Sequence, residues 1–311
     1  MGLGWRGKLG WGLVGGGALL AGAALLTRRR RVPFGLWIDN SAPVVATAAF
    51  WDEVAALGVE VAAIMVESSR LGWDRLHSRA QLESAIGHAR ARDIAVVLTT
   101  WPSPTPRALD AQATEMDELL SLGVIGWEVD LEGGWLPSKV GGGFSGLEEA
   151  SAVLVEIMHR ARERHDVRLE VTTHTGHRES KPAAWVTPFV DRLNLQLYAT
   201  RLDWRDEEVP WGSRNGPGRR QAWGIDQALQ IPAIQDGRVS LGVGLALWRQ
   251  AWPGHSVAEA LSQSYQASAV QPSVEVRGWS SKYVTRGARY SEEVAQWLQT
   301  NIKRPLRKKR Y

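Results

Sequence analysis

Three carboxylates lie two residues apart in the stretch 123–135, which reads GVIGWEVDLEGGW. Glu128, Asp130 and Glu132 alternate there with large apolar residues. Successive side chains of a strand point to opposite faces, so the three acids share one face at spacings of about 6.5–7 Å. Acids clustered in a partly desolvated site favour the protonated form of one of them, which a general acid requires. We therefore expect an ionised Asp130 beside a protonated Glu132 that donates its proton.

The elements that must position these acids follow from the hydropathy pattern after Pro33. Short apolar runs predict eight strands, at 34–39, 60–66, 93–99, 126–131, 168–173, 192–198, 239–247 and 274–280. Amphipathic stretches predict a helix after each strand, near 48–57, 78–92, 108–121, 146–164, 182–190, 221–230, 256–269 and 290–300. Eight such pairs predict an α/β fold, the (β/α)8 TIM barrel. A doubly wound sheet is the alternative, but no glycine-rich phosphate loop follows the first strand.

In a closed barrel, one face of each strand points into the interior and the other packs under helices. The apolar residues of the fourth strand suit the helix side, so its acids should point inward. Glu132 should then reach the C-terminal rim, where barrel enzymes carry out their chemistry. A solvated acidic edge is the alternative, but charge buried in a central strand is costly without a purpose, and this favours a catalytic use.

The stretch GWEVDLEG resembles the strand-four signature of family 18 glycoside hydrolases, the chitinase family, which reads Asp-Gly-x-Asp-x-Asp-x-Glu. Gly126, Asp130 and Glu132 match this signature, whereas Ile125 and Glu128 replace its first two aspartates. The resemblance implies that Glu132 is the proton donor. It also implies that Asp130 orients the N-acetyl group of the substrate, which itself attacks the anomeric carbon.

Two further stretches resemble the same family. LNLQLYAT is similar to its strand-six Met-x-Tyr-Asp, with Gln196 at the Met position, Tyr198 as the Tyr and Ala199 in place of the Asp. VRGWSS is similar to the region whose Trp forms the floor of the sugar subsite, which makes Trp279 the counterpart. The resemblance implies that Tyr198 contacts the reacting N-acetyl group. Ordinary barrel packing is the alternative for Tyr198 and Trp279.

The opening GLWIDNSA resembles the Gly-Ile-Asp-x-Ser start of family 25 lysozymes, which cut bacterial cell walls. Their acidic strand also carries Asp-x-Glu, as residues 130–132 do, and Asp39 would then join the site. Both resemblances imply hydrolysis of a β-1,4 bond next to an N-acetylated sugar, in peptidoglycan or a chitin-like polymer. A layout with a second glutamate at the end of strand seven is disfavoured, because VSLGVGLALWRQ contains no acid.

Sixteen tryptophans against four phenylalanines suit a carbohydrate cleft, because indole faces stack on sugar rings while the N–H bonds hydroxyls. Structural packing is the alternative for about half of them. Besides the catalytic Glu132, Asp130 and Tyr198, the residues expected to contact substrate are Glu128, Asp39, Trp101, Trp135, His174, Gln196, Trp248 and Trp279.

Two other kinds of function stay open. His174 and His177, three apart after strand five, could bind zinc in a metal-dependent hydrolase, but no His-x-His follows strand one, so neither metal nor cofactor is expected. The replaced acids could instead indicate a barrel that binds glycans without cutting them. Retention of Asp130 and Glu132 favours an enzyme.

The formal charge of +4 is unevenly distributed. Residues 1–31 and 303–311 together hold 12 of the 37 basic residues and no acid, which leaves 25 basic against 33 acidic residues in 32–302. An acidic body argues against a nucleic-acid partner. The basic ends are instead expected to contact a membrane surface. The chain has no cysteine, which excludes disulfides and thiolate metal sites.

Residues 9–26 form an uncharged run of 18 residues, which as a helix of about 27 Å would nearly span a bilayer core. The run predicts a membrane anchor or a signal peptide, with a buried or partner-bound helix as the alternative. We expect three parts: an N-terminal segment at 1–31, a catalytic barrel at 32–302 and a basic tail at 303–311. The protein is then anchored in the membrane or exported to the cell envelope. The arginines at 28–31 leave the side of the membrane open.

Overall fold

The structure is a computed structural model that describes residues 33–40, 42–66, 77–131, 135, 137–141, 143–173, 180–197, 216–247, 254–269, 275–287 and 290–302. The segment 1–31 and the tail 303–311 lie outside these ranges, so the anchor and the membrane contact stay predictions. Within the described ranges, no helix combines the length and the apolar composition that a bilayer crossing requires.

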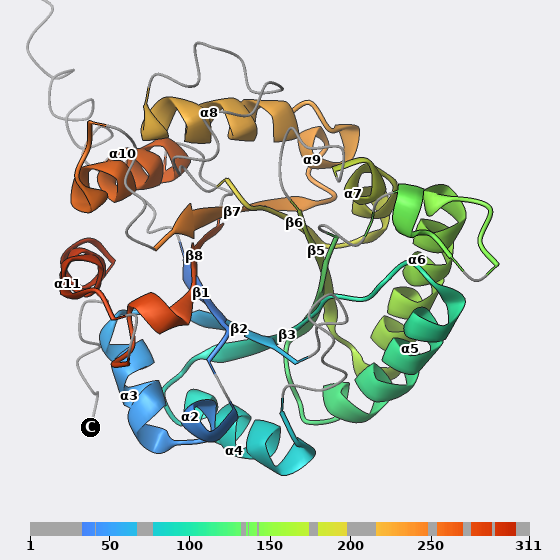
Figure 1. The fold of residues 1–311 in the computed structure, drawn as a ribbon, viewed down its shortest axis with the longest axis horizontal. Coiled ribbons are helices and arrows are strands. Elements are labelled where there is room, and N and C mark those ends of the chain that lie inside the picture. The colour runs from blue at the N-terminus through green and yellow to red at the C-terminus, as the bar shows by residue number, and fades with distance from the viewer. Residues whose placement is uncertain are drawn as a thin grey trace, which may run out of the picture. The chain divides into compact units, whose positions relative to one another are not determined.

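Eight parallel strands close into a barrel, which Figure 1 shows end-on. Each strand pairs with its neighbours in sequence, and β8 closes the ring against β1. The predicted (β/α)8 TIM barrel is confirmed, and a strand is present at each of the eight predicted positions. The strands are β1 (Phe34–Ile38), β2 (Val61–Met65), β3 (Ala95–Thr100), β4 (Gly126–Asp130), β5 (Arg168–Thr173), β6 (Arg192–Leu195), β7 (Ser240–Ala246) and β8 (Glu275–Trp279).

Helices surround the strands (Figure 1), and each of the eight predicted helices is present. The short α2 and α9, each a single turn, were not predicted. The helices are α2 (Ala42–Val45), α3 (Ala48–Ala56), α4 (Arg79–Arg90), α5 (Pro106–Leu120), α6 (Leu147–His165), α7 (Ser180–Val186), α8 (Pro217–Ala228), α9 (Pro232–Gln235), α10 (Val257–Ala269) and α11 (Glu292–Asn301).

Side-chain caps set where several of these helices begin. The Ser78 hydroxyl accepts from the backbone N–H of Gln81, whose side chain accepts in return from the backbone N–H of Ser78, a capping box at the start of α4. At the start of α5, the Thr105 hydroxyl accepts from the backbone N–H of Ala108, and Thr105 precedes Pro106, whose fixed φ suits the first helical position. These caps place the helices directly after the loops of the C-terminal rim.

Apolar packing is concentrated between the strands and the helices. The outward-facing residues of all eight strands join the helices in one large core. Inside the barrel, the buried apolar cluster is small and consists of Trp37, Val61, Ala63 and Val97, with Trp279 packed against it. These residues come from the β8 and β1–β3 side, so the remaining interior is filled by other side chains.

Charged residues fill the other half of the interior, where TIM barrels usually carry Val, Ile and Leu. Arg277 on β8 lies at the centre and pairs with Glu170 at 2.6 Å, with Glu275 at 2.7 Å and with Glu128. Three arginines face three glutamates here, so the formal charges of the cluster sum to zero. The members of this interior cluster are Glu128, Arg168, Glu170, Arg192, Asn194, Glu275 and Arg277.

Two glycines make room for the interior cluster. A Cβ on Gly35 would lie 2.7 Å from Cγ of Arg277, and a Cβ on Gly242 would collide with the Asn194 amide. Real Cβ atoms do not approach other atoms so closely. The side chains of Arg277 and Asn194 therefore fit only because positions 35 and 242 carry no side chain.

We predict that Gly35→Ala destabilises the protein by about 1–3 kcal/mol, because the new methyl group overpacks the stem of Arg277. Gly87→Ala is the matched control: Gly87 lies within α4 and a Cβ there meets no atom within 4 Å, so it should be neutral or stabilising by up to about 1 kcal/mol. Chemical denaturation of both variants measures the difference. Equal stability of the two variants would contradict the packing argument.

Candidate active site

The two faces of β4 divide as predicted. Trp127, Val129 and Leu131 have no exposed surface and belong to the core under the helices. Glu128 and Asp130 point into the barrel, where they meet residues of β6. The inward acids therefore lie at two depths, with Glu128 lower and Asp130 at the C-terminal end of the strand.

Glu128 belongs to the interior cluster. It is 0% exposed, and its carboxylate accepts from the Trp37 indole N–H at 2.6 Å, from Asn194 Nδ2 at 2.8 Å and from Arg277. These contacts give Glu128 a structural position beneath the rim, whereas the sequence analysis expected it to touch substrate. Its depth follows from its place two residues before the end of β4.

Burial and charge shift the two central glutamates in opposite directions. Burial raises the pKa of Glu128, an effect that exceeds the opposing attraction of Arg277. Burial also disfavours ionisation of Glu170, but the combined attraction of Arg277, Arg168 and Arg192 prevails and lowers its pKa from 4.5 to about 2. Glu170 is therefore the firmly anionic member of the pair.

Asp130 lies directly above this layer and is 3% exposed. Its Oδ1 accepts a hydrogen bond from Nε2 of Gln196, at 3.3 Å. Gln196 follows β6 and is itself buried. The structure thus brings together two residues that the sequence analysis placed at the site from separate motifs, and it fixes the carboxyl of Asp130 from across the barrel.

Four of the predicted site residues lie outside the described residues: Glu132, His174, Tyr198 and Trp248. Leu131, directly before Glu132, packs outward with no exposed surface. Strand alternation continued by one residue turns Glu132 inward, above Asp130, and this orientation stays a prediction.

Asp39 follows β1 and is held by residues that follow β8. Its carboxylate accepts from the hydroxyls of Ser280 and of Ser281, the latter at 3.2 Å, and pairs with Nζ of Lys282 at 3.0 Å. Sequence reasoning missed these three partners. The polar run directly after strand eight was the available signal, because closure of a barrel places strand eight beside strand one.

The tryptophans expected to line the site differ in burial. Trp135 has no exposed surface, and its N–H donates to the Pro102 carbonyl at 2.9 Å, which makes it a core residue. Trp101 follows β3 and is half-buried. Trp279 ends β8, is also half-buried, and meets the ring of Trp37 edge to face, with centroids 5.9 Å apart. Trp279 is therefore the tryptophan whose described geometry best suits a sugar platform.

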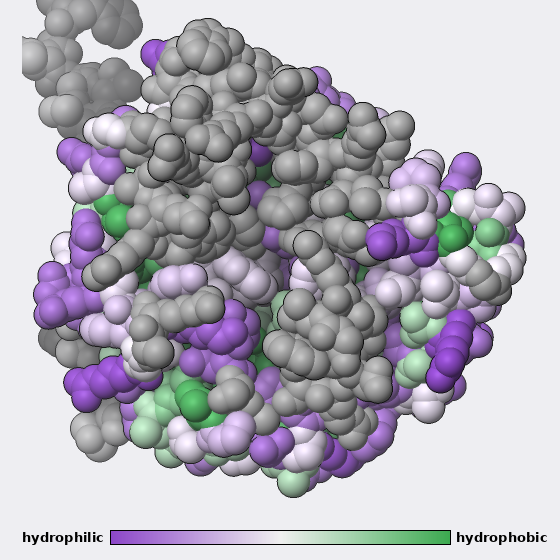
Figure 2. Space-filling model, viewed as in Figure 1, coloured by the Kyte–Doolittle hydropathy of each residue, from purple (hydrophilic) through white to green (hydrophobic). Residues whose placement is uncertain are grey.

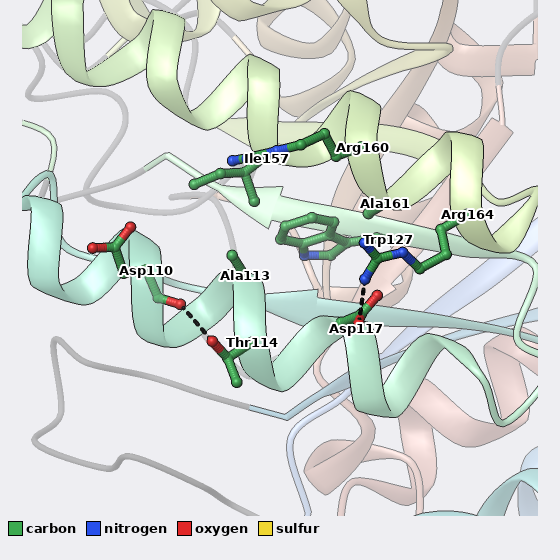
Figure 3. A pocket seen from close by; sticks show the side chains of 9 residues that line it. All are labelled: Asp110, Ala113, Thr114, Asp117, Trp127, Ile157, Arg160, Ala161 and Arg164. Carbon is green, nitrogen blue, oxygen red and sulfur yellow. Dashed lines mark hydrogen bonds and ion pairs between the residues drawn. The ribbon is translucent and has the colours of Figure 1, made fainter.

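The face drawn in Figure 2 exposes hydrophilic residues near its middle. A separate cavity of about 480 Å³ lies on the outer side of β4, between α5 and α6, with Trp127 at its base (Figure 3). Its charged residues Asp117 and Arg164 pair with each other. Since Trp127 and Asp130 point to opposite faces of β4, this cavity does not contain the candidate acids.

Among the described residues, no group of three acids or histidines is arranged to hold a metal ion.

No protein-family model matches the sequence, and no curated protein resembles it significantly. Solved structures do resemble the fold. A GH113 beta-1,4-mannanase is 9% identical with a TM-score of 0.57, over 88% of this chain and 97% of its own. A GH5_18 protein from Streptomyces cattleya in complex with Manb1-4GlcNAc is 14% identical with a TM-score of 0.60, over 80% and 71%.

The catalytic domain of a hyperthermophilic chitinase from Pyrococcus furiosus is 13% identical with a TM-score of 0.56, over 88% of this chain and 97% of that domain. At such identities the likeness is one of fold. These structural neighbours are glycoside hydrolases built on the TIM barrel, the architecture described above for this chain.

We predict that Glu170→Gln destabilises the folded state at pH 7 by about 3–5 kcal/mol, because it leaves buried arginines without a counter-charge. Glu128→Gln makes the same chemical change one strand away. It should cost less, on the order of 1 kcal/mol, because burial already disfavours the ionised form of Glu128. Urea denaturation of both variants tests the ranking, which equal losses would contradict.

The pH dependence of this difference has a defined sign. A carboxyl whose pKa is lowered by folding contributes stability above its unfolded pKa and loses it as the pH falls through the folded value. The advantage of the wild type over Glu170→Gln should therefore be constant above pH 4.5 and shrink as the pH falls toward 2. Denaturation at a series of pH values measures this window, and an advantage that persists unchanged at pH 2 would contradict the prediction.

Proposed function

We propose that the chain is a glycoside hydrolase that cleaves β-1,4 linkages in a polymer containing N-acetylhexosamine, of the peptidoglycan or chitin type. The observation that carries the proposal is Asp130, buried at the C-terminal end of β4 inside a closed (β/α)8 barrel and bonded to Gln196. Barrel enzymes carry out their chemistry at this end of the strands. The fold shared with a mannanase and a chitinase supports the same class of reaction.

In the proposed reaction, the carboxyl of Glu132 gives its proton to the glycosidic oxygen while the bond from that oxygen to the anomeric carbon breaks. The carbonyl oxygen of the substrate's N-acetyl group attacks the same carbon and closes an oxazolinium ring. The Asp130 carboxylate accepts a hydrogen bond from the N-acetyl N–H and stabilises the developing positive charge. Water then opens the ring and returns a proton to Glu132.

Substrate assistance is favoured over a pair of catalytic carboxylates. Such a pair needs a second acid about 5–9.5 Å from the first. Residues 239–250, which include β7, contain no acid. Of the two other candidate acids, Asp203 lies outside the described residues, and Asp39 already accepts from two hydroxyls and pairs with an ammonium group. These three contacts fix Asp39 against the segment that follows β8, which suits a role in shaping the rim.

We predict that Glu132→Gln lowers kcat about 10²–10⁴-fold on peptidoglycan or chitin oligomers, because no other group supplies the proton to the leaving oxygen. Asp130→Asn should also lower kcat strongly, because the amide cannot stabilise the positive ring. Both variants should still bind the glycan. Mass spectrometry of the new reducing ends measures turnover, and calorimetry with the same oligomers measures affinity.

Asp110→Asn is the matched control, since Asp110 is an exposed acid on α5 that lines the separate cavity between α5 and α6. It should leave turnover at the wild-type level. The proposal is wrong if Glu132→Gln turns over substrate as fast as this control. Binding of oligomers by a wild-type protein that never cleaves them would instead identify a non-catalytic glycan-binding barrel.

A further inference from the structure

Trp37 is held inside the barrel on two sides. It is 2% exposed, and its indole N–H donates to Oε1 of Glu128 at 2.6 Å. The guanidinium of Arg277 lies over its ring, 5.6 Å from the centroid. A bonded N–H fixes the rotation of the ring in its plane, and a cation over the face restrains its tilt. Trp37 is therefore a side chain of defined orientation that belongs to the apolar cluster of the interior and is bonded to the charged one.

The ring of Trp37 contacts the ring of Trp279, which lies at the rim. The two rings meet at an interplanar angle of 62°, with centroids 5.9 Å apart. This is the edge-to-face geometry that aromatic pairs prefer. Trp279 retains exposed surface at the end of β8, whereas Trp37 has almost none. A change in the tilt of Trp37 would thus alter the platform that Trp279 offers to a ligand.

The backbone of Trp279 is tied to the same acid. Arg277 precedes Trp279 by two residues on β8, so both side chains face the interior. Arg277 pairs with Glu128, the residue that accepts from Trp37. Glu128 therefore restrains Trp279 by two routes, one through the ring of Trp37 and one through the strand that carries Trp279.

We propose that Trp37 is a positioning residue for a sugar subsite on Trp279: its hydrogen bond to Glu128 sets the ring angle, and that angle sets the platform on which an N-acetylhexosamine ring stacks. The inference deepens the proposed function and rests on it. It also gives the charged interior beneath the rim a role in binding. For stability alone, a barrel interior filled with apolar side chains would suffice.

The test compares Trp37→Phe with Trp51→Phe. Trp51 is also buried, donates its N–H to the Val45 carbonyl at 2.8 Å and meets Phe50 edge to face, but it lies on α3, outside the barrel. Both variants lose one indole hydrogen bond and should lose similar stability. Only Trp37→Phe should raise KM, about three- to tenfold, since an aromatic pair is worth 0.5–1.5 kcal/mol. Its kcat should change less than twofold.

A double-mutant cycle separates positioning from general damage. In a Trp279→Ala background, Trp37→Phe should have no further effect on KM, because the platform that it orients is gone. Additive effects would overturn the inference. So would equal KM values for Trp37→Phe and Trp51→Phe in active enzyme.

Glu128 supplies a second pair of variants if Trp37→Phe does not fold. Glu128→Leu removes the acceptor of the Trp37 N–H and should raise KM as Trp37→Phe does. Glu128→Gln keeps a carbonyl acceptor for that N–H and should recover most of the wild-type KM despite its lower stability. Equal KM values for both Glu128 variants would overturn the inference.

Glycan affinity, measured by calorimetry with chitin oligomers, keeps this inference distinct from the proposed function. If the wild-type protein binds oligomers without cutting them, the hydrolase proposal fails, but Trp37→Phe must still weaken binding relative to Trp51→Phe. If it cuts them and Trp37→Phe binds as tightly as Trp51→Phe, the hydrolase proposal stands and the positioning role fails.

Discussion

The guanidinium of Arg277 connects four strands across the interior of the barrel. It pairs with Glu128 on β4, Glu170 on β5 and Glu275 on β8, and it covers the ring of Trp37 on β1. A buried cation is tolerated only where counter-charges surround it closely. Glu170, whose pKa folding lowers, is the carboxylate whose removal leaves this cation least compensated. The tilt of Trp37 and the need for a glycine at position 35 both depend on this one side chain.

Two acids of similar chemistry serve different purposes because they differ in depth by one strand repeat. Glu128 is enclosed by donors on three strands and belongs to the interior cluster. Asp130, two residues later, has reached the end of β4 and is bonded to Gln196. Asp39 has a third role, joining β1 to the segment after β8 through Ser280, Ser281 and Lys282. The position of an acid along its strand thus decides whether it lies in the interior cluster or at the C-terminal end of the barrel.

The barrel and the inward turn of the acids could be predicted from the sequence, because both depend on local periodicity. The alternation of Glu128 and Asp130 with apolar neighbours places them inside any closed sheet. α2 and α9 were missed because a single turn has no amphipathic period. The buried state of Trp135 could not be predicted, since its direction depends on a loop that brings its N–H to the Pro102 carbonyl.

The residues of the interior cluster form a pattern that is visible in the sequence, but this pattern was not recognised as a cluster. Arg168 and Glu170, Arg192 and Asn194, and Glu275 and Arg277 each lie two residues apart on a predicted strand, so each pair shares a face. In isolation, each pair is typical of a solvated strand face. Only closure of the barrel brings the pairs together and shows that their formal charges balance. Pairing across four strands is information that no single stretch contains.

The close fit of Gly35 and Gly242 against the interior cluster limits which single substitutions the barrel can accept during evolution. Replacing Arg277 by leucine would leave empty space over Gly35 and, at the same time, would remove the cation that three buried carboxylates share. An ordinary apolar barrel therefore lies several simultaneous substitutions away, and each single step toward it is disfavoured. Descendants of this chain should keep the whole set or replace the whole set, and intermediate combinations should be rare.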